Sequence, residues 1–121
     1  MATIGRGVLS ASVYEFFDGI RTFDAERACR VLAEGAAFDA PWTDAPLEGR
    51  EAIQAFLKEW LEDTEKRPSF SIMDVSGDGN VVRLDLSVSG RFGRSPQRVR
   101  MHLLDLKGTI HHVLVRPLAK A

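Results

Sequence analysis

The spacing of apolar residues changes once along this chain of 121 residues, and that change limits the folds open to it. Up to Leu61, apolar side chains recur three and four positions apart, the period of an amphipathic helix. Pro68 cannot continue a helix, and beyond it apolar and polar residues alternate as in a half-buried strand. The pattern therefore predicts helices first and a run of antiparallel strands after them, an α+β fold with the helices on one face of the sheet.

Three helices are predicted in the first half of the chain. Asp24 is typical of an N-cap for the second helix, which we expect to stop at Gly35. Gly49 opens the third helix, which we expect to end before Pro68, and residues 36–42 predict a short strand between the two. The first helix is marked by apolar residues at helical spacing: Leu9, Val13, Phe16, Phe17 and Ile20.

The second half predicts a meander of strands. A first strand begins at Phe70, and the turn residues 77–80 connect it to the clearest alternation in the chain. A third strand follows, and residues 110–116 close the sheet. The residues expected on the inner face of the middle strands are Val82, Leu84, Leu86, Val88, Val99, Met101 and Leu103.

Charge and composition exclude several classes of function. The 16 Lys and Arg residues nearly balance the 17 Asp and Glu residues, which argues against a protein that binds nucleic acid or an anionic membrane through overall charge. No apolar run approaches the roughly 20 residues of a membrane span. The single cysteine, Cys29, cannot form an internal disulfide, which fits a reducing compartment. We expect one domain over residues 1–121 and a cytoplasmic location.

Four segments carry a family resemblance: residues 16–24, 33–41, 47–56 and 107–110. The run Gly-x-x-Ala-Ile-x-x-Phe from Gly49 to Phe56 is the most distinctive of them. In this order they resemble the NTF2-like superfamily, which includes ketosteroid isomerase, SnoaL-like polyketide cyclases and limonene epoxide hydrolase. The resemblance covers nearly the whole chain. It implies a cone in which N-terminal helices pack on the concave face of a strongly curved, mainly antiparallel sheet, with an apolar pocket between them and a homodimer through the outer face of the sheet.

Because of this resemblance, we compared the chain with ketosteroid isomerase. That enzyme uses an Asp as general base, and a Tyr and a protonated acid that donate hydrogen bonds to the enolate oxygen. In this chain the Tyr position falls on Phe16, the position of the base on Ala40 and that of the protonated acid on Met101. None of these residues carries a titratable group. Isomerisation by the usual mechanism is therefore disfavoured. Asp39 lies one residue from the base position, so strand geometry points it to the other face unless an irregularity near Pro41 turns it inward.

The epoxide hydrolase uses an Arg-x-Asp pair on one strand and a second Asp on the last strand. Arg83 and Asp85 match the Arg-x-Asp motif in sequence. However, the alternation of the strand places both on the outer face, where a cross-strand ion pair is the simpler interpretation. The second Asp falls on Val115. This chemistry is disfavoured as well.

His111 is the best candidate for the acid or base that a SnoaL-like cyclase needs. Strand alternation places it on the same face as Val113 and Val115, and imidazole titrates near neutral pH. The alternative is a structural histidine bonded to the preceding turn. His102 and His112 are expected on the outer face, and adjacent strand residues such as His111 and His112 point apart, which disfavours a metal site. The sequence contains no motif for a cofactor or a metal.

Two hypotheses for function follow. The first is a cofactor-independent enzyme of the cyclase or isomerase type that binds a largely hydrophobic small molecule, with His111 or Asp39 as acid/base. The second is a non-catalytic ligand-binding module, or a dimeric interaction module whose outer face carries Leu104, Leu106 and Leu114. The residues expected to line the pocket are Phe16, Ile20, Phe38, Ala40, Trp42, Phe56, Trp60, Leu84, Leu86, Met101, Leu103, His111, Val113 and Val115.

Overall fold

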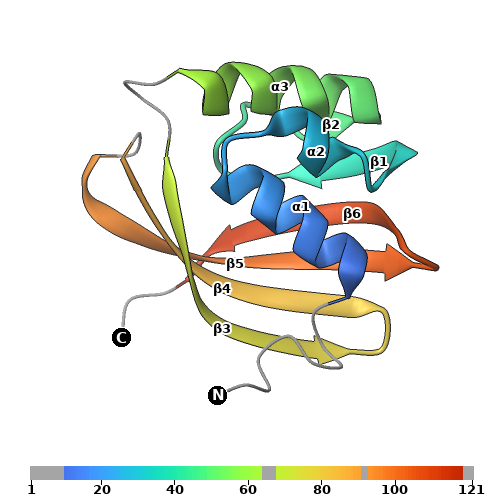
Figure 1. Cartoon of the computed structure of the whole chain (residues 1–121). Coiled ribbons are helices and arrows are strands. Elements are labelled where there is room, and N and C mark those ends of the chain that lie inside the picture. The colour runs from blue at the N-terminus through green and yellow to red at the C-terminus, as the bar shows by residue number, and fades with distance from the viewer. Residues whose placement is uncertain (1–9, 64–67, 91–92, 119–121) are drawn as a thin grey trace.

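A computed structural model describes residues 10–63, 68–90 and 93–118 of the chain. These residues form a six-stranded curled sheet and three helices, the α+β cone that the sequence predicted. Figure 1 shows the sheet wrapping around α1, with α3 covering the end where β1 and β2 lie. The helices are α1 (Ala11–Arg21), α2 (Ala25–Cys29) and α3 (Arg50–Glu62), and the strands are β1 (Leu32–Asp39), β2 (Leu47–Glu48), β3 (Ser69–Asp78), β4 (Val81–Gly90), β5 (Gly93–Leu106) and β6 (Thr109–Pro117).

The strands lie side by side in the order β2-β1-β6-β5-β4-β3. Consecutive strands from β3 to β6 pair antiparallel, and β1 pairs parallel with β6, so the N-terminal half is fastened to the last strand of the chain. β3 stands at one edge of this sheet. The start of β3 passes beside the C-terminal end of α1 (Figure 1).

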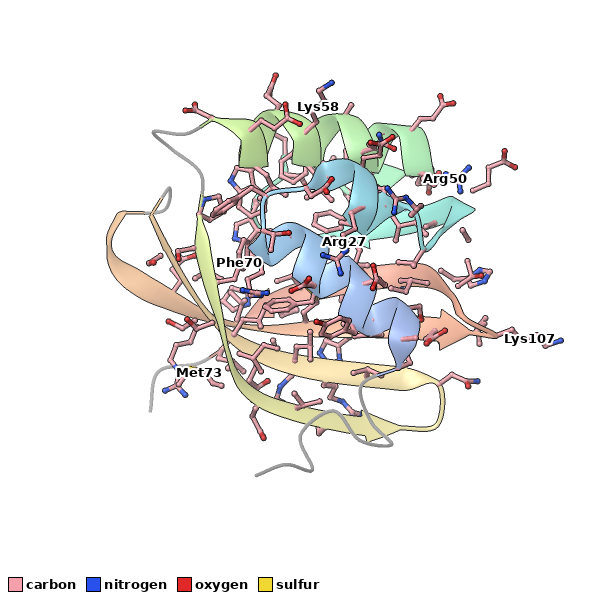
Figure 2. The ribbon with its side chains drawn as sticks, viewed as in Figure 1. Arg27, Arg50, Lys58, Phe70, Met73 and Lys107 are labelled. Carbon is pink, nitrogen blue, oxygen red and sulfur yellow. The ribbon has the colours of Figure 1, made fainter. Side chains whose placement is uncertain are left out.

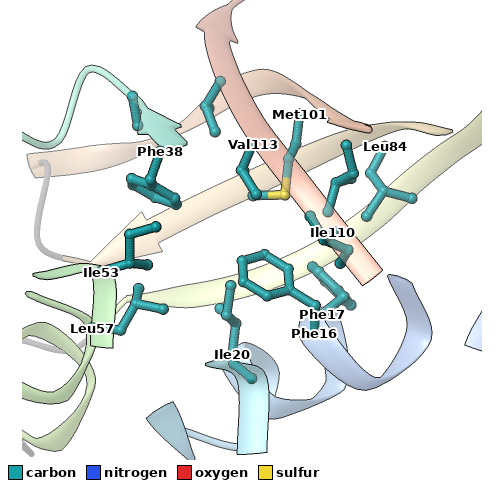
Figure 3. Packing of buried hydrophobic residues seen from close by; sticks show 14 of the residues in the cluster. Phe16, Phe17, Ile20, Phe38, Ile53, Leu57, Leu84, Met101, Ile110 and Val113 are labelled. Atoms are coloured by element: carbon teal, nitrogen blue, oxygen red, sulfur yellow. The ribbon is translucent and has the colours of Figure 1, made fainter. Parts of the chain in front are cut away.

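The core forms between α1 and the inner face of the sheet. Leu84, Met101 and Val115 are paired across β4, β5 and β6, and all three are fully buried. Phe16 and Ile20 of α1 point toward this row, as Figure 3 shows. Each such side chain contributes roughly 1.5–3 kcal/mol by leaving water. The alternation predicted for residues 82–88 is therefore confirmed.

The sequence prediction of the second helix is wrong beyond Cys29. The helix ends there, and Leu32 already pairs with Ile110 as the start of β1. Gly35, expected to stop the helix, lies exposed within β1, where the register against β6 shifts between Leu32 and Ala37. Spacing alone does not distinguish a short helix from a bulged strand, because the partner strand lies almost 80 residues away in sequence. The short strand β2 was not predicted.

Two polar contacts fix the ends of α1. At its start, the Ser12 hydroxyl donates to the Asp105 carboxylate at 2.7 Å, and the N-cap Ser10 bonds to the same oxygen, which ties α1 to the end of β5. Toward its end, the Asp18 Oδ2 atom lies 2.6 Å from Arg27 Nη1 on α2, and Asp18 Oδ1 accepts from Arg21. The hydrogen bonds from Arg21, and then those from Arg27, hold the pKa of the Asp18 carboxyl below its ordinary value of 3.8.

α1 and α2 also touch through their backbones. A Cβ atom placed on Gly19 would lie 2.6 Å from the backbone nitrogen of Ala28 and 2.8 Å from its Cα. We predict that Gly19→Ala lowers the free energy of unfolding by about 1–3 kcal/mol, because backbone atoms must separate to admit the methyl group. Urea denaturation measures the change.

Gly35→Ala is the matched control for that substitution. No heavy atom lies within 4 Å of a Cβ at Gly35, so its effect should stay within about 0.5 kcal/mol. Equal stability of the two variants would contradict the close packing of α1 on α2.

The Asp18 ion pairs predict a pH dependence of stability. A carboxyl whose pKa is lowered on folding stabilises the protein fully above its unfolded pKa, and the contribution is lost as the pH falls through the folded value. Unfolding curves of the wild type and Asp18→Asn, recorded on both sides of pH 3.8, should differ most at neutral pH and converge in acid. Asp44→Asn, at an exposed carboxylate, should follow the wild type, and a constant gap between wild type and Asp18→Asn would refute the linkage.

Candidate functional site

The three positions that carry chemistry in ketosteroid isomerase are apolar and buried in this chain. Phe16 and Met101 have no water-accessible surface, and Ala40 is buried beside them in the same core. In the part of the chain that the structure describes, the buried polar side chains are those of Ser12 and Asp18, and both are hydrogen-bonded. The positions where the isomerase carries its chemistry therefore hold no group for proton transfer, and the nearest described acid between α1 and the sheet, Asp105, is bonded to Ser10 and Ser12.

The residues expected to line an internal pocket form the packed core of this structure. A side chain that faces a void large enough for water exposes surface to it, and most of these residues expose none. Trp42 and Phe56 are half-buried at the wide end of the cone, and Trp60 and Ala40 are buried. The residues that are buried with at most 1% of their surface exposed are Phe16, Ile20, Phe38, Leu84, Leu86, Met101, Leu103, Val113 and Val115.

Five aromatic rings pack together between α3, β1 and the start of β3. We call Phe38, Trp42, Phe56, Trp60 and Phe70 the aromatic cluster. Trp42 and Trp60 have ring centroids 4.8 Å apart, Phe56 stacks on Trp60 at 5.3 Å, and Phe70 meets Trp60 edge to face at 5.7 Å. The cluster joins α3 to β1 and β3, and Phe70 also contacts Phe17 of α1.

His111 is exposed, so the prediction that it shares the inward face of Val113 and Val115 is wrong. The pairing of β5 with β6 shifts at this point: Leu104 is opposite His112, and Asp105 is opposite Ile110. His111 is the extra residue of this bulge, and Ile110 takes the buried place instead. A bulge reverses the alternation of side chains, which a count along the strand does not reveal.

Asp39 lies on the outer face of β1, between the buried residues Phe38 and Ala40. Its Oδ2 atom accepts from Arg116 Nη2 at 3.0 Å. No inward turn occurs near Pro41, so the structure does not bring Asp39 and His111 together in one cavity.

The Asp85 carboxylate is also on the outer face, as predicted. Arg100 on the neighbouring strand donates to both of its oxygens, at 2.7 and 3.0 Å, and this lowers the pKa of Asp85. His102 stands next to this pair, half-buried, and its own burial together with Arg83 lowers its pKa. This cross-strand ion pair is the structural role expected of Asp85, and its partner is Arg100 on β5.

A groove of about 400 Å³ lies between α1 and the free edge of β3, and we call it the α1–β3 groove. Its floor is Phe17 and Phe70, whose rings meet edge to face at 6.4 Å. Three consecutive residues of β3 line it although neighbours in a strand point to opposite faces, so the groove runs along the edge of the strand. Figure 2 shows Phe70 on the stretch of β3 beside α1. The lining residues are Tyr14, Phe17, Asp18, Arg21, Phe70, Ser71 and Ile72.

The groove has an apolar middle and one charged end. Tyr14 is 50% exposed and Ile72 36% exposed, so the walls of the groove present large apolar side chains to water. At the charged end Asp18 binds Arg21 and Arg27, and Arg27 also donates to both oxygens of Glu15, at 2.9 and 3.2 Å. These bonds lower the pKa of Glu15 and raise the pKa of Arg27.

Sequence reasoning missed this groove. Tyr14, Phe17, Asp18 and Arg21 follow one another at positions i, i+3, i+4 and i+7, so they form one stripe along α1. This stripe could have indicated a site on α1 from the sequence alone, because Asp18 interrupts the apolar face of the helix. The signal does not indicate which strand the stripe faces.

Other chemistry is sparse in the described residues. Cys29 is buried, and its burial raises the pKa of the thiol to about 12, so it stays protonated at neutral pH. No three side chains of the metal-binding types gather anywhere in residues 10–63, 68–90 and 93–118. Within the same ranges, every helix is too short or too polar to cross a bilayer.

Solved structures with the same fold place this chain among known proteins. A "putative ketosteroid isomerase" from Kribbella flavida DSM 17836 superposes with a TM-score of 0.78 at 16% identity, over 98% of this chain and 84% of that one. A "putative polyketide cyclase" from Sinorhizobium meliloti gives 0.78 at 20% identity, over 89% and 95% of the two chains. An NTF2-like protein of unknown function from Cytophaga hutchinsonii ATCC 33406 gives 0.74 at 19% identity, over 88% and 87%.

These identities are low, so the structural neighbours establish the fold and not the reaction. No curated protein matches the sequence. The family model for the SnoaL-like domain matches residues 13–115, which span α1 through most of β6. The chain therefore belongs to the SnoaL-like domain family and has the NTF2-like fold.

Proposed function

We propose that this protein binds a largely apolar small molecule without transforming it, and that the α1–β3 groove is the binding site. One observation carries the proposal: aromatic residues of the core, Phe17 and Phe70, form the floor of an open groove flanked by the exposed Tyr14 and Ile72. The volume of about 400 Å³ falls within the range of roughly 300–1,000 Å³ found for small-molecule sites.

The groove shares one residue, Phe70, with the aromatic cluster. Phe70 belongs to both, since its ring contacts Phe17 on one side and Trp42 and Trp60 on the other. A ligand over Phe70 would lie against the most polarisable part of the core. This supports a ligand with a ring system, because rings stack favourably on aromatic side chains.

The absence of turnover is supported by the surroundings of the groove. Isomerases and cyclases of this fold need a group that takes or gives a proton near neutral pH. The titratable side chains that line the groove are Tyr14, Asp18 and Arg21, and the Asp18 carboxylate already accepts from two guanidinium groups. The sequence candidates for acid/base catalysis, His111 and Asp39, lie outside the groove.

Substitutions of exposed groove residues test the site without creating a cavity in the core. Tyr14→Ser and Ile72→Ser each remove apolar surface from the groove wall, and we expect each to weaken binding of the probe 2-naphthamide about fivefold, from roughly 1 kcal/mol of lost burial. Fluorescence titration gives the affinities. Met73→Ser is the matched control, because Met73 is 50% exposed next to Ile72 but does not line the groove.

Two outcomes would contradict the proposal. Unchanged affinity in both groove variants would place the ligand elsewhere, for example among the aromatic cluster. A substrate whose turnover is lost in His111→Ala would replace the non-catalytic proposal with the cyclase hypothesis.

A second proposal concerns the outer face of the sheet. Leu104, Leu106 and Leu114 are half-buried there, and the strand register places Leu104 beside Val81 and Leu114 beside His102. Such an apolar strip between ion pairs favours association of two copies through this face.

The oligomeric state tests this second proposal. We expect the wild type to be a dimer at micromolar concentration and Leu114→Arg to be a monomer, because the substitution buries an unpaired charge in the contact. Light scattering distinguishes the two. Met73→Arg, at an exposed position on β3, should remain dimeric, and a monomeric wild type would disprove the interface.

A further inference from the structure

The charged end of the α1–β3 groove has one open set of hydrogen-bond donors. Arg21 uses its Nε, at 3.1 Å, and its Nη2 to bind the Asp18 Oδ1 atom. A guanidinium carries five N–H donors, so the outer edge of Arg21, including Nη1, is directed away from this pair. The side chain of Arg21 is 53% exposed, which leaves that edge open to a ligand in the groove.

The acceptors at the same end are already engaged. Asp18 Oδ2 lies 2.6 Å from Arg27 Nη1, and the other donors of Arg27 bind the carboxylate of Glu15. Two acids and two arginines therefore balance in charge, and both carboxylates already bind guanidinium groups. A cationic ligand would be repelled by Arg21, and it would have no free carboxylate to bind.

The distances along α1 set the shape of the ligand. Tyr14 and Arg21 are seven residues apart on one stripe, which corresponds to about 10 Å along the helix. The apolar floor of Phe17 and Phe70 lies between them, with the Ser71 hydroxyl as a further polar group of the lining. A ligand that fills the groove therefore places its apolar body on the two rings and its polar end at Arg21.

From these observations we infer that the ligand is an aromatic or alicyclic carboxylic acid, whose carboxylate binds the outer edge of Arg21 while its ring covers Phe17 and Phe70. This inference rests on the proposed function of the groove and adds the charge and polarity of what it binds. A single guanidinium edge matches a planar monoanion, because two N–H groups point in parallel at two oxygens.

A pair of nearly isosteric probes tests the inference. At neutral pH 2-naphthoate carries a carboxylate, and 2-naphthamide has the same ring system with a neutral amide. We expect the wild type to bind 2-naphthoate about three- to tenfold more tightly, the range of a partly exposed ion pair. Added salt should reduce this preference, since the pair lies near water, and should leave the binding of 2-naphthamide unchanged.

Substitution of Arg21 assigns the preference to one residue. In Arg21→Gln the two probes should bind equally. Arg98→Gln removes the same charge from an exposed position on β5 outside the groove, and it should keep the full preference for the acid. Arg21→Lys keeps the charge but loses the parallel donors, so it should retain only part of the preference.

The outcomes separate this inference from the function on which it rests. Equal binding of both probes by the wild type, or a preference that persists in Arg21→Gln, overturns the acid specificity and leaves the groove as a binding site. Failure of the wild type to bind either probe overturns both. If Arg21→Gln does not fold, the salt dependence in the wild type decides, because a preference that is insensitive to salt is incompatible with the Arg21 contact.

Discussion

The apolar contact between α1 and the inner face of the sheet is the constraint on which the remaining structure depends. Phe16 and Ile20 press on a layer built by alternate residues of β4, β5 and β6, and that layer exposes almost nothing to water. A polar group buried there without a hydrogen-bond partner would cost about 2–7 kcal/mol. Charged groups are consequently found at the ends of α1, at the rim and on the outer face.

The position of α1 also creates the groove. The helix is held at its start by Ser10 and Ser12 on Asp105, and toward its end by Asp18 on Arg27 and by the close approach of Gly19 to Ala28. It packs against α2, β5 and β6. β3 stands at the edge of the sheet, and the space between its first residues and α1 is lined by Tyr14 and Ile72 among others. The groove is thus a consequence of how the helix is anchored.

Membership of the SnoaL-like family explains the fold and leaves the chemistry to be decided by individual residues. The cone persists at 14–20% identity among its structural neighbours, because it requires only alternation and helix amphipathicity. A catalytic site requires particular groups at particular depths. Here those depths hold Phe16, Ala40 and Met101, which strengthen the core and cannot carry a proton.

The sequence by itself determined that helices come before a run of antiparallel strands, the inner face of β4 and β5, and the outward position of Asp39, because these follow from local periodicity and from residue chemistry. It did not determine where β1 begins, which residue of β6 faces inward, or that Tyr14 lies opposite Ile72. Each of these depends on pairing between residues far apart in the chain: Leu32 with Ile110, and Leu104 with His112 across a bulge that turns His111 outward. Only the packed tertiary structure decides such pairings, since a one-residue shift in a strand exchanges its two faces at no local cost.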